Sequence, residues 1–247
     1  MTKKRVVVTG ASSGIGAAAV RALRNTGWDV VAVARREDRL RELAEETGAQ
    51  TVTCDITDKA SVDAMARTVL AGGGVDALVN NAGGAFGMDS VADGNPEDWT
   101  RMYNVNVLGT LYVTQVFLPS LRENGRGSIL MLTSTAALAA YEGGAGYCAA
   151  KAGEEAMAQA LRLEEAEHNV RVIEILPGMV KTEEFAVNRL GDAAAAAKIY
   201  AGVSKPLTAE DVADVMAYAL NAPHHVNLDQ VVIRPVAQAA QHKVIRR

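Results

Sequence analysis

Short apolar runs rich in valine and isoleucine recur along this chain and alternate with longer amphipathic stretches. The runs are RVVVTG, DVVAVA, AQTVTCD, VDALVNN, SILMLTS, VRVIEIL and QVVIRP. Apolar strands separated by segments of helix length are typical of a parallel sheet that is covered by helices on both faces. With right-handed crossovers, the pattern predicts an α/β fold with a doubly wound parallel sheet in the order 3-2-1-4-5-6.

The alternation shows no internal repeat and no linker, and the length of the chain suits one α/β domain. We therefore expect a single domain over residues 1–247. One stretch, from about 178 to 206, departs from the alternation because it holds an alanine run and scattered charges after the sixth strand. It predicts a small helical lid inserted over the strand ends.

The sequence predicts the starts of two helices from their capping residues. Asn95 precedes Pro96, which fits an N-cap followed by proline at the first helical position. Thr208 precedes the acidic pair Glu210 and Asp211, as expected at a capped helix start.

The bulk properties exclude several classes of protein. The formal charge of -4 and the pI near 5.6 argue against nonspecific binding to nucleic acid or to an acidic membrane. No apolar run has the length of a membrane span, and the N-terminal residues enter a strand directly, so we expect a cytoplasmic protein with no membrane partner. Two cysteines, Cys54 and Cys148, predict neither a disulfide framework nor a metal site.

Tyr147 and Lys151, in YCAAK, are four residues apart and lie on one face if this segment is a helix. A free tyrosine, with a pKa of about 10, is a poor base at neutral pH. A cation about 4 Å away supplies roughly 4 kcal/mol of phenolate stabilisation at an effective dielectric of about 20. Ser134 ends the SILMLTS strand, where an open α/β sheet binds its ligands. The three side chains predict a proton-transfer site.

Glycines in the first strand–helix turn predict a phosphate site. Gly10, Gly14 and Gly16 let the backbone turn tightly and let an anion approach the free N–H groups of a helix N-terminus. Their spacing is G-x-x-x-G-x-G, which differs from the G-x-G-x-x-G of the common dinucleotide fold.

TGASSGIG near the N-terminus, NNAG in the middle, and Ser134 thirteen residues before the Tyr147–Lys151 pair occur together in this order. This set resembles the short-chain dehydrogenase/reductase family over essentially the full length of the chain. The resemblance implies a single-domain Rossmann-type fold with a seventh strand beyond the six expected above. It also implies an oxidoreductase that acts on alcohols or ketones with a nicotinamide cofactor.

The resemblance carries a set of cofactor contacts onto this chain. Ser12, Ser13 and Ile15 would line the phosphates with the three glycines, and Asp55 would contact the adenine. The remaining contacts, with the ribose and the nicotinamide carboxamide, are assigned to Asn80, Ala82, Gly83, Tyr147, Lys151, Pro177, Gly178, Val180 and Thr182.

The end of the second strand favours NADP over NAD. An acid about twenty residues beyond the glycines commonly holds the ribose 2′-hydroxyl of NAD. Here Arg35 and Arg36 occupy that place, and guanidinium groups suit a 2′-phosphate. An exposed helix start with mixed charges is the alternative interpretation.

Asn106, in YNVNVLGT, matches the catalytic asparagine of the family, where it holds a water near the lysine. The mechanism that the resemblance implies uses Ser134 to bind the substrate oxygen and Tyr147 to exchange its proton. Lys151 stabilises the phenolate and holds the nicotinamide ribose.

The C-terminal third resembles a subgroup of NADP-dependent dehydrogenases of serine, allo-threonine and other short 3-hydroxy acids, which also includes reductases of other aldehydes and ketones. A carboxylate substrate needs a cation near the lid; Lys181, Arg189, Lys198 and Lys205 are candidates, and the sequence does not choose among them. A catalytically silent NADP-binding regulator and an isomerase, dehydratase or epimerase remain as other readings. The family usually pairs subunits through long helices, so we expect a homodimer or homotetramer.

Overall fold

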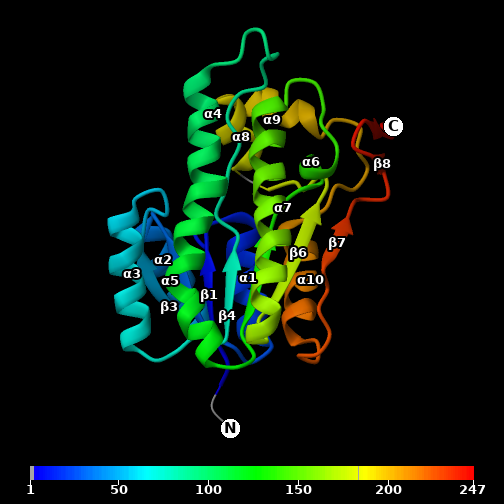
Figure 1. The fold of residues 1–247 in the computed structure, drawn as a ribbon. Helices are drawn as coiled ribbons and strands as arrows, with labels where there is room; N and C mark the ends of the chain where they lie inside the picture. The colour runs from blue at the N-terminus through cyan, green and yellow to red at the C-terminus, as the bar shows by residue number, and fades with distance from the viewer. Residues whose placement is uncertain (1–2, 183) are drawn as a thin grey trace.

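The computed structural model describes residues 3–182 and 184–247 (Figure 1). In this part of the chain, seven parallel strands form one sheet in the order β3-β2-β1-β4-β5-β6-β7. The predicted order and the seventh strand are therefore confirmed. The strands are β1 (Arg5–Thr9), β2 (Asp29–Ala34), β3 (Gln50–Thr53), β4 (Ala77–Asn80), β5 (Ser128–Leu132), β6 (Arg171–Pro177) and β7 (Gln230–Ile233).

Helices cover both faces of the sheet because successive strand side chains point to opposite sides and both sets are apolar. Val6 and Val8 of β1 pack in one core and Val7 packs in the other, and all three side chains are fully buried. The first core lies under α1 (Gly14–Asn25), α2 (Glu37–Thr47) and α10 (Ala209–Asn221), and the second under α3 (Lys59–Ala71), α5 (Gly109–Glu123) and α7 (Ala145–Glu165).

A long helical segment extends past the carboxyl ends of the strands (Figure 1). It consists of α4 (Pro96–Tyr103), a π-helical turn η1 (Asn104–Leu108) and α5. Asn95 caps it as predicted, because its side chain accepts a hydrogen bond of 3.0 Å from the Glu97 backbone N–H. Thr208 caps α10 in a full capping box with Asp211.

Two short helices, α8 (Phe185–Leu190) and α9 (Ala193–Ile199), follow β6 and lie beyond the carboxyl ends of the strands (Figure 1). They pack against each other, and the side chain of Asp192 caps α9. The helical segment expected after the sixth strand is therefore present.

The structure also contains elements that the apolar pattern did not indicate. A short helix, α6 (Thr135–Leu138), lies between Ser134 and Tyr147. A single 3-10 turn, η2 (Ala166–His168), follows α7, and a hairpin of β8 (Gln238–Ala240) and β9 (Lys243–Val244) ends the chain. Among the described residues, no helix is both long and apolar enough to cross a membrane.

Candidate active site

A cavity of about 1450 Å³ opens at the carboxyl ends of the strands. It exceeds the ~300–1,000 Å³ typical of a site for one small ligand, so it has room for a dinucleotide and a small substrate. The cavity is lined by most of the residues expected at the site: Gly10, Ser12, Ser13, Gly14, Ile15, Gly16, Arg35, Arg36, Asp55, Ala82, Gly83, Ser134, Tyr147, Lys151, Pro177, Gly178, Val180 and Thr182.

The first strand–helix turn is closely packed against the loop after β4. Gly10 has φ of +66°, and a Cβ there would lie 2.7 Å from Asn81 Nδ2. A Cβ on Gly16 would collide with the carbonyl oxygen of Gly10. Glycine is thus required by close backbone approach at these positions. Because none of the side chains that the structure describes caps the N-terminus of α1, its first N–H groups are available to an anion.

Arg36 meets a carboxylate of this same chain at the mouth of the phosphate site. Its two terminal nitrogens donate to Glu184, at 2.7 Å to Oε1 and 2.9 Å to Oε2. Ser13 Oγ donates to the same carboxylate at 2.9 Å. The ion pair raises the pKa of Arg36, and its hydrogen bonds lower the pKa of Glu184. Arg36 and Ser13 therefore bind an anionic group, and a dinucleotide phosphate requires donors of this kind.

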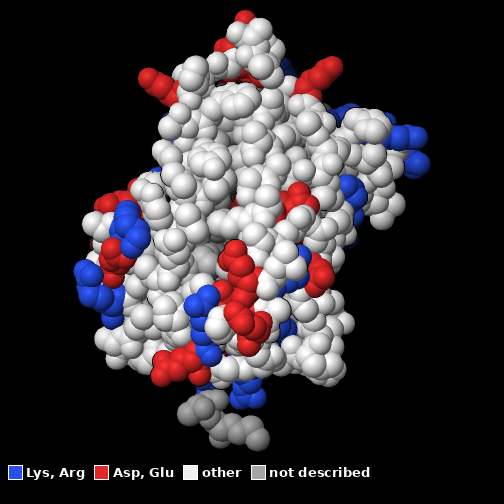
Figure 2. Space-filling model, viewed as in Figure 1, with Lys and Arg blue, Asp and Glu red and all other residues white. Residues whose placement is uncertain are grey.

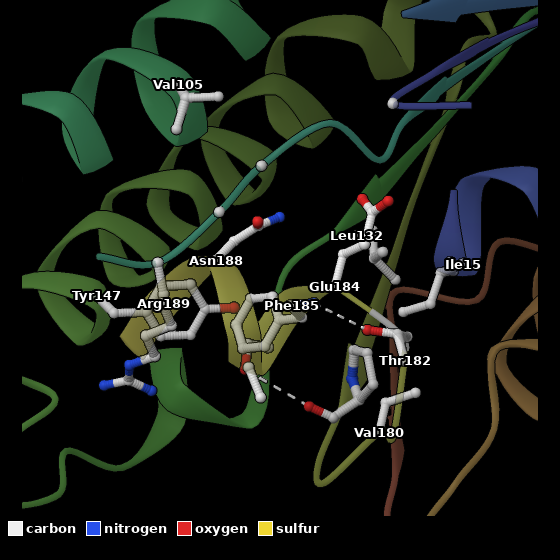
Figure 3. A pocket seen from close by; sticks show the side chains of 18 of the residues that line it. Ile15, Val105, Leu132, Tyr147, Val180, Thr182, Glu184, Phe185, Asn188 and Arg189 are labelled. Atoms are coloured by element: carbon white, nitrogen blue, oxygen red, sulfur yellow. Dashed lines mark hydrogen bonds between the residues drawn. The ribbon is translucent and has the colours of Figure 1, made fainter. Parts of the chain in front are cut away.

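Thr182 lies over the same turn and connects it to the first residue of α8. A Cβ on Gly14 would lie 3.4 Å from Thr182 Cγ2, and the Thr182 hydroxyl accepts a 3.4 Å hydrogen bond from the Phe185 backbone N–H (Figure 3). Arg35, in contrast, is exposed at the rim.

The structure does not bring the Asn80 side chain to the cavity. Its Nδ2 is buried and donates to Thr114 Oγ1 at 2.9 Å, so the side chain braces β4 against α5. Asn81, the second asparagine of NNAG, lines the cavity instead, and its Nδ2 donates to the carbonyl oxygen of Thr9 at 2.8 Å. Asn81 faces the cavity and Asn80 does not, because successive residues along an extended strand point to opposite faces of the sheet.

α7 begins at Ala145, so Tyr147 and Lys151 lie one turn apart on the same helix face. Both are buried, with exposures of 8% and 4%. Ser134 is the N-cap of α6: its Oγ accepts a 3.1 Å hydrogen bond from the Ala136 N–H and lies 3.5 Å from the carbonyl oxygen of Pro177. All three residues line the same cavity.

Lys151 Nζ has two hydrogen-bond partners among the residues that the structure describes. It donates to the carbonyl oxygen of Leu132 at 3.0 Å and to Glu154 Oε2 at 2.6 Å. Burial alone would lower the pKa of Lys151, but the charge and hydrogen bond of Glu154 together with the charges of Tyr147 and Glu174 outweigh it, and the pKa lies above its ordinary value. Glu154 is not among the residues predicted from the sequence, although an acid three residues after Lys151 lies on the same helix face.

Asn106 is fully buried in the π-helical turn beneath the cavity wall. Its Nδ2 donates to the carbonyl oxygens of Gly84 and Met102, both at 2.8 Å, and its Oδ1 accepts from the Gly84 N–H at 3.2 Å. A Cβ on Gly83 would lie 3.4 Å from Lys151 Nζ and 2.5 Å from Asn106 Oδ1. Asn106 thus holds the loop after β4 close to the lysine.

The side chains of α8 form one wall beside Tyr147. The ring of Phe185 meets that of Tyr147 edge to face, with 5.8 Å between centroids (Figure 3). The Arg189 guanidinium carbon also lies 5.8 Å from the Tyr147 ring centroid. Arg189 donates to Tyr141 Oη at 2.8 Å and to two loop carbonyls, so it fastens α8 to the body of the protein. Of the four candidate cations, Arg189 and Lys198 line the cavity.

The family model for short chain dehydrogenases matches residues 4–192, which is more than half of the chain. The chain belongs to the short-chain dehydrogenase family. Among its relatives in this family, an uncharacterized oxidoreductase of Mycobacterium tuberculosis is 51% identical over 97% of this chain and 94% of the relative. An NADP-dependent 3-hydroxy acid dehydrogenase of Salmonella typhimurium is 36% identical over 95% of this chain and 96% of the relative. A sulfoacetaldehyde reductase of Chromohalobacter salexigens is 38% identical over 95% of each.

Solved structures of the family show the same fold. The closed form of a serine dehydrogenase complexed with NADP+ superposes with a TM-score of 0.92 at 35% identity, covering 98% of this short-chain dehydrogenase and 99% of that chain. The serine dehydrogenase of Escherichia coli gives a TM-score of 0.83 at 32% identity, with 95% and 99% covered.

Proposed function

We propose that this protein is an NADP-dependent oxidoreductase that interconverts an alcohol and its aldehyde or ketone. The observation that carries the proposal is the buried Lys151 ammonium one helical turn from Tyr147, at the wall of a cavity that also contains the glycine turn. A phenol next to a buried cation, open to a cavity of this size, is arranged for proton exchange with a ligand.

The residues of the turn fit a dinucleotide with a 2′-phosphate. Gly10 and Gly16 leave room for close approach, the N-terminus of α1 offers free N–H groups, and Arg36 already binds an anion in Glu184. NADP would supply or accept the hydride when it is bound. The relatives named as NADP-dependent and the neighbour complexed with NADP+ support this choice of cofactor.

Each member of the predicted catalytic set takes one task. Ser134 binds the substrate oxygen, and Tyr147 gives its phenolic proton to that oxygen during reduction or removes it during oxidation. Lys151 stabilises the resulting phenolate, and Asn106 holds the loop after β4 that passes close to Lys151. Reduction leaves the phenol deprotonated, so a proton must return from solvent before the next turnover.

We propose a short substrate with an anionic group. Short 3-hydroxy acids such as serine or allo-threonine carry a carboxylate, and sulfoacetaldehyde carries a sulfonate; relatives at 36% and 38% identity are named for these two classes. Arg189, buried beside Tyr147 at the cavity wall, is the cation that we propose faces such a group. An uncharged aldehyde or ketone is the alternative substrate.

A catalytically silent NADP-binding regulator is the alternative from another class. A regulator needs the phosphate site but has no use for a buried lysine beside a phenol. Oxidation of NADPH, followed by absorbance with a panel of short aldehydes and ketones with and without an acid group, separates the two. We expect turnover that is abolished in Tyr147→Phe. Binding of NADPH with no turnover on any member would contradict the oxidoreductase.

We further propose that residues 178–206 act as a lid, that the protein is cytoplasmic, and that it works as a homo-oligomer. The upper part of the surface formed by α4, α5 and α7 carries few charged side chains (Figure 2). Ala149, Ala152 and Ala156 are exposed on α7, where small residues permit close approach of a second helix.

A further inference from the structure

Glu154 is an acid that the proposed mechanism does not use, yet it touches the lysine on which that mechanism depends. Its side chain is fully buried, and its Oε2 lies 2.6 Å from Lys151 Nζ. Its other oxygen, Oε1, accepts a weak hydrogen bond of 3.5 Å from Thr110 Oγ1 on α5. The carboxylate is therefore held from two sides and has Lys151 as its cation.

Few charged groups face this pair. On α7, the phenol of Tyr147 lies on the Lys151 side, and α5 contributes only the neutral Thr110. From β6, the carboxylate of Glu174 acts on both members of the pair. In the part of the chain that the structure describes, Lys151 is thus the cation shared by two carboxylates and a phenol.

Glu174 is a distinct group with its own partners. It accepts hydrogen bonds of 2.8 Å from Thr133 Oγ1 and of 2.8 Å from Gln230 Nε2, and Glu155 and Arg162 are the charged groups that face it from α7. Burial raises the pKa of Glu174. Since Glu174 has no hydrogen bond to Lys151 among the contacts described, Glu154 is the direct counter-ion.

We propose that Glu154 is a positioning residue of the active site: its carboxylate fixes the Lys151 ammonium and partly neutralises it, and this sets the pH range in which Tyr147 exchanges its proton. The inference rests on the proposed role of Tyr147. An isolated ammonium stabilises a neighbouring phenolate more than an ion pair does, because the carboxylate opposes its field.

Burial raises the pKa of Glu154 to about 7, against the opposing effect of Lys151. The pKa of Lys151 lies above its ordinary value, so above about pH 7 the carboxylate of Glu154 and the ammonium of Lys151 are both charged. Glu154 is therefore ionised at the alkaline pH at which alcohol oxidation is favoured. In Glu154→Gln the side chain at this position is a neutral amide at every pH, and Lys151 keeps the carbonyl oxygen of Leu132 as a partner.

The size of the effect follows from the spacing on α7. Tyr147 and Glu154 are seven residues apart, a rise of roughly 10 Å along the helix. At that separation and an effective dielectric of about 20, removal of the negative charge favours the phenolate by on the order of one pH unit. Glu154→Gln should therefore form the Tyr147 phenolate at a lower pH than the wild type.

The direct test is a pH titration of phenolate absorbance in the protein without cofactor or substrate. The Tyr147 signal is isolated by subtracting the titration of the matching Tyr147→Phe protein, made in both the wild-type and the Glu154→Gln background. We expect the midpoint to fall by about one pH unit in Glu154→Gln. Glu164→Gln, which removes an exposed carboxylate from the same helix, should leave it in place.

A second variant guards against a change of packing. Glu154→Met fills a similar volume with no charge, and Lys151 keeps its bond to Leu132, so the same downward shift is expected. A midpoint that is unchanged or that rises in the soluble variants would overturn the inference. The pH profile of alcohol oxidation should move in parallel. If the phenolate titration shifts but no alcohol is oxidised, the role of Glu154 stands and the proposed function fails.

Discussion

Lys151 Nζ has three N–H donors, and among the described residues it donates to Leu132 and Glu154. We expect the third donor to bind a cofactor hydroxyl. The third donor is the one that the proposed ribose contact needs. The phenol of Tyr147, the ammonium of Lys151 and the carboxylate of Glu154 lie on one face of α7, because residues three and four apart are neighbours on a helix. Each of these residues can therefore be tested separately.

Tyr147→Phe keeps the ring in its edge-to-face contact with Phe185 but removes the exchangeable proton. We expect kcat to fall by about 10²–10⁴, the effect typical of losing a general acid or base. NADP binding should survive, because the phosphate groups are held at the glycine turn. Stopped-flow measurement of the hydride step and a binding titration check both expectations. Near-normal turnover would show that another group moves the proton.

Glu154 also predicts how stability depends on pH. Its pKa in the folded protein is raised from 4.5 to about 7, so the folded state binds this proton more tightly than the unfolded state does. Stability from this group is full below pH 4.5 and is lost as pH rises through about 7. The difference in unfolding free energy between the wild type and Glu154→Gln should change by on the order of 3 kcal/mol from pH 4.5 to pH 8. Urea unfolding at several pH values measures it, and a constant difference would refute the assignment.

At the scale of elements, the residues before α8 and the loop after β2 are joined by one ion pair. Arg36 and Glu184 are 148 residues apart in sequence, and Ser13 on the glycine turn binds the same carboxylate. A 2′-phosphate at Arg36 has to displace Glu184 or share the guanidinium with it. Cofactor binding and the position of the proposed lid are therefore coupled through one side chain.

This coupling gives opposite expectations for its two members. Arg36→Ala should weaken NADP relative to NAD by at least tenfold, since a charge-assisted hydrogen bond contributes about 1.5–3 kcal/mol. Glu184→Gln should strengthen NADP binding and leave NAD nearly unchanged, because it removes a competitor for Arg36. Arg35→Ala, at the exposed neighbour, is the matched control and should have the smaller effect. Calorimetric titration with both cofactors measures the ratios, and a wild type that binds NAD as tightly as NADP would count against the 2′-phosphate site.

At the scale of the whole molecule, the upper part of the surface formed by α4, α5 and α7 carries few charged side chains in Figure 2. Tyr103, the last residue of α4, is 49% exposed, and Leu163 on α7 is 82% exposed. Ala150 is buried, whereas Ala149, Ala152 and Ala156 face solvent. One side of α7 therefore packs inside the chain, and the other side is exposed and available to the proposed partner subunit.

We expect a dimer or tetramer by light scattering at micromolar concentration. Ala152→Arg should shift the protein toward smaller species, because a guanidinium on a closely packed helix face cannot be accommodated without losing contacts. Glu45→Arg on α2, on the opposite face of the sheet, should leave the mass unchanged. A monomeric wild type would contradict the proposed assembly.

The sequence by itself determined the strand order, the caps at Asn95 and Thr208, and the presence of Tyr147 and Lys151 on one helix face. Periodicity and capping are local, so a few neighbouring residues are enough to express them. Most of the predicted residues line one cavity, because their motifs follow the strands and parallel strands all end at the same edge of the sheet.

Only the tertiary structure decided which asparagine of NNAG faces the cavity, that Arg36 is paired with Glu184, and that Glu154 is buried against Lys151. The first depends on the pleat at the exact end of β4. The second joins segments that are remote in sequence. The third needed the burial of α7, since an acid three residues from a lysine on an exposed helix is an ordinary surface pair, and the loss of water around both charges is what makes this one matter to the site.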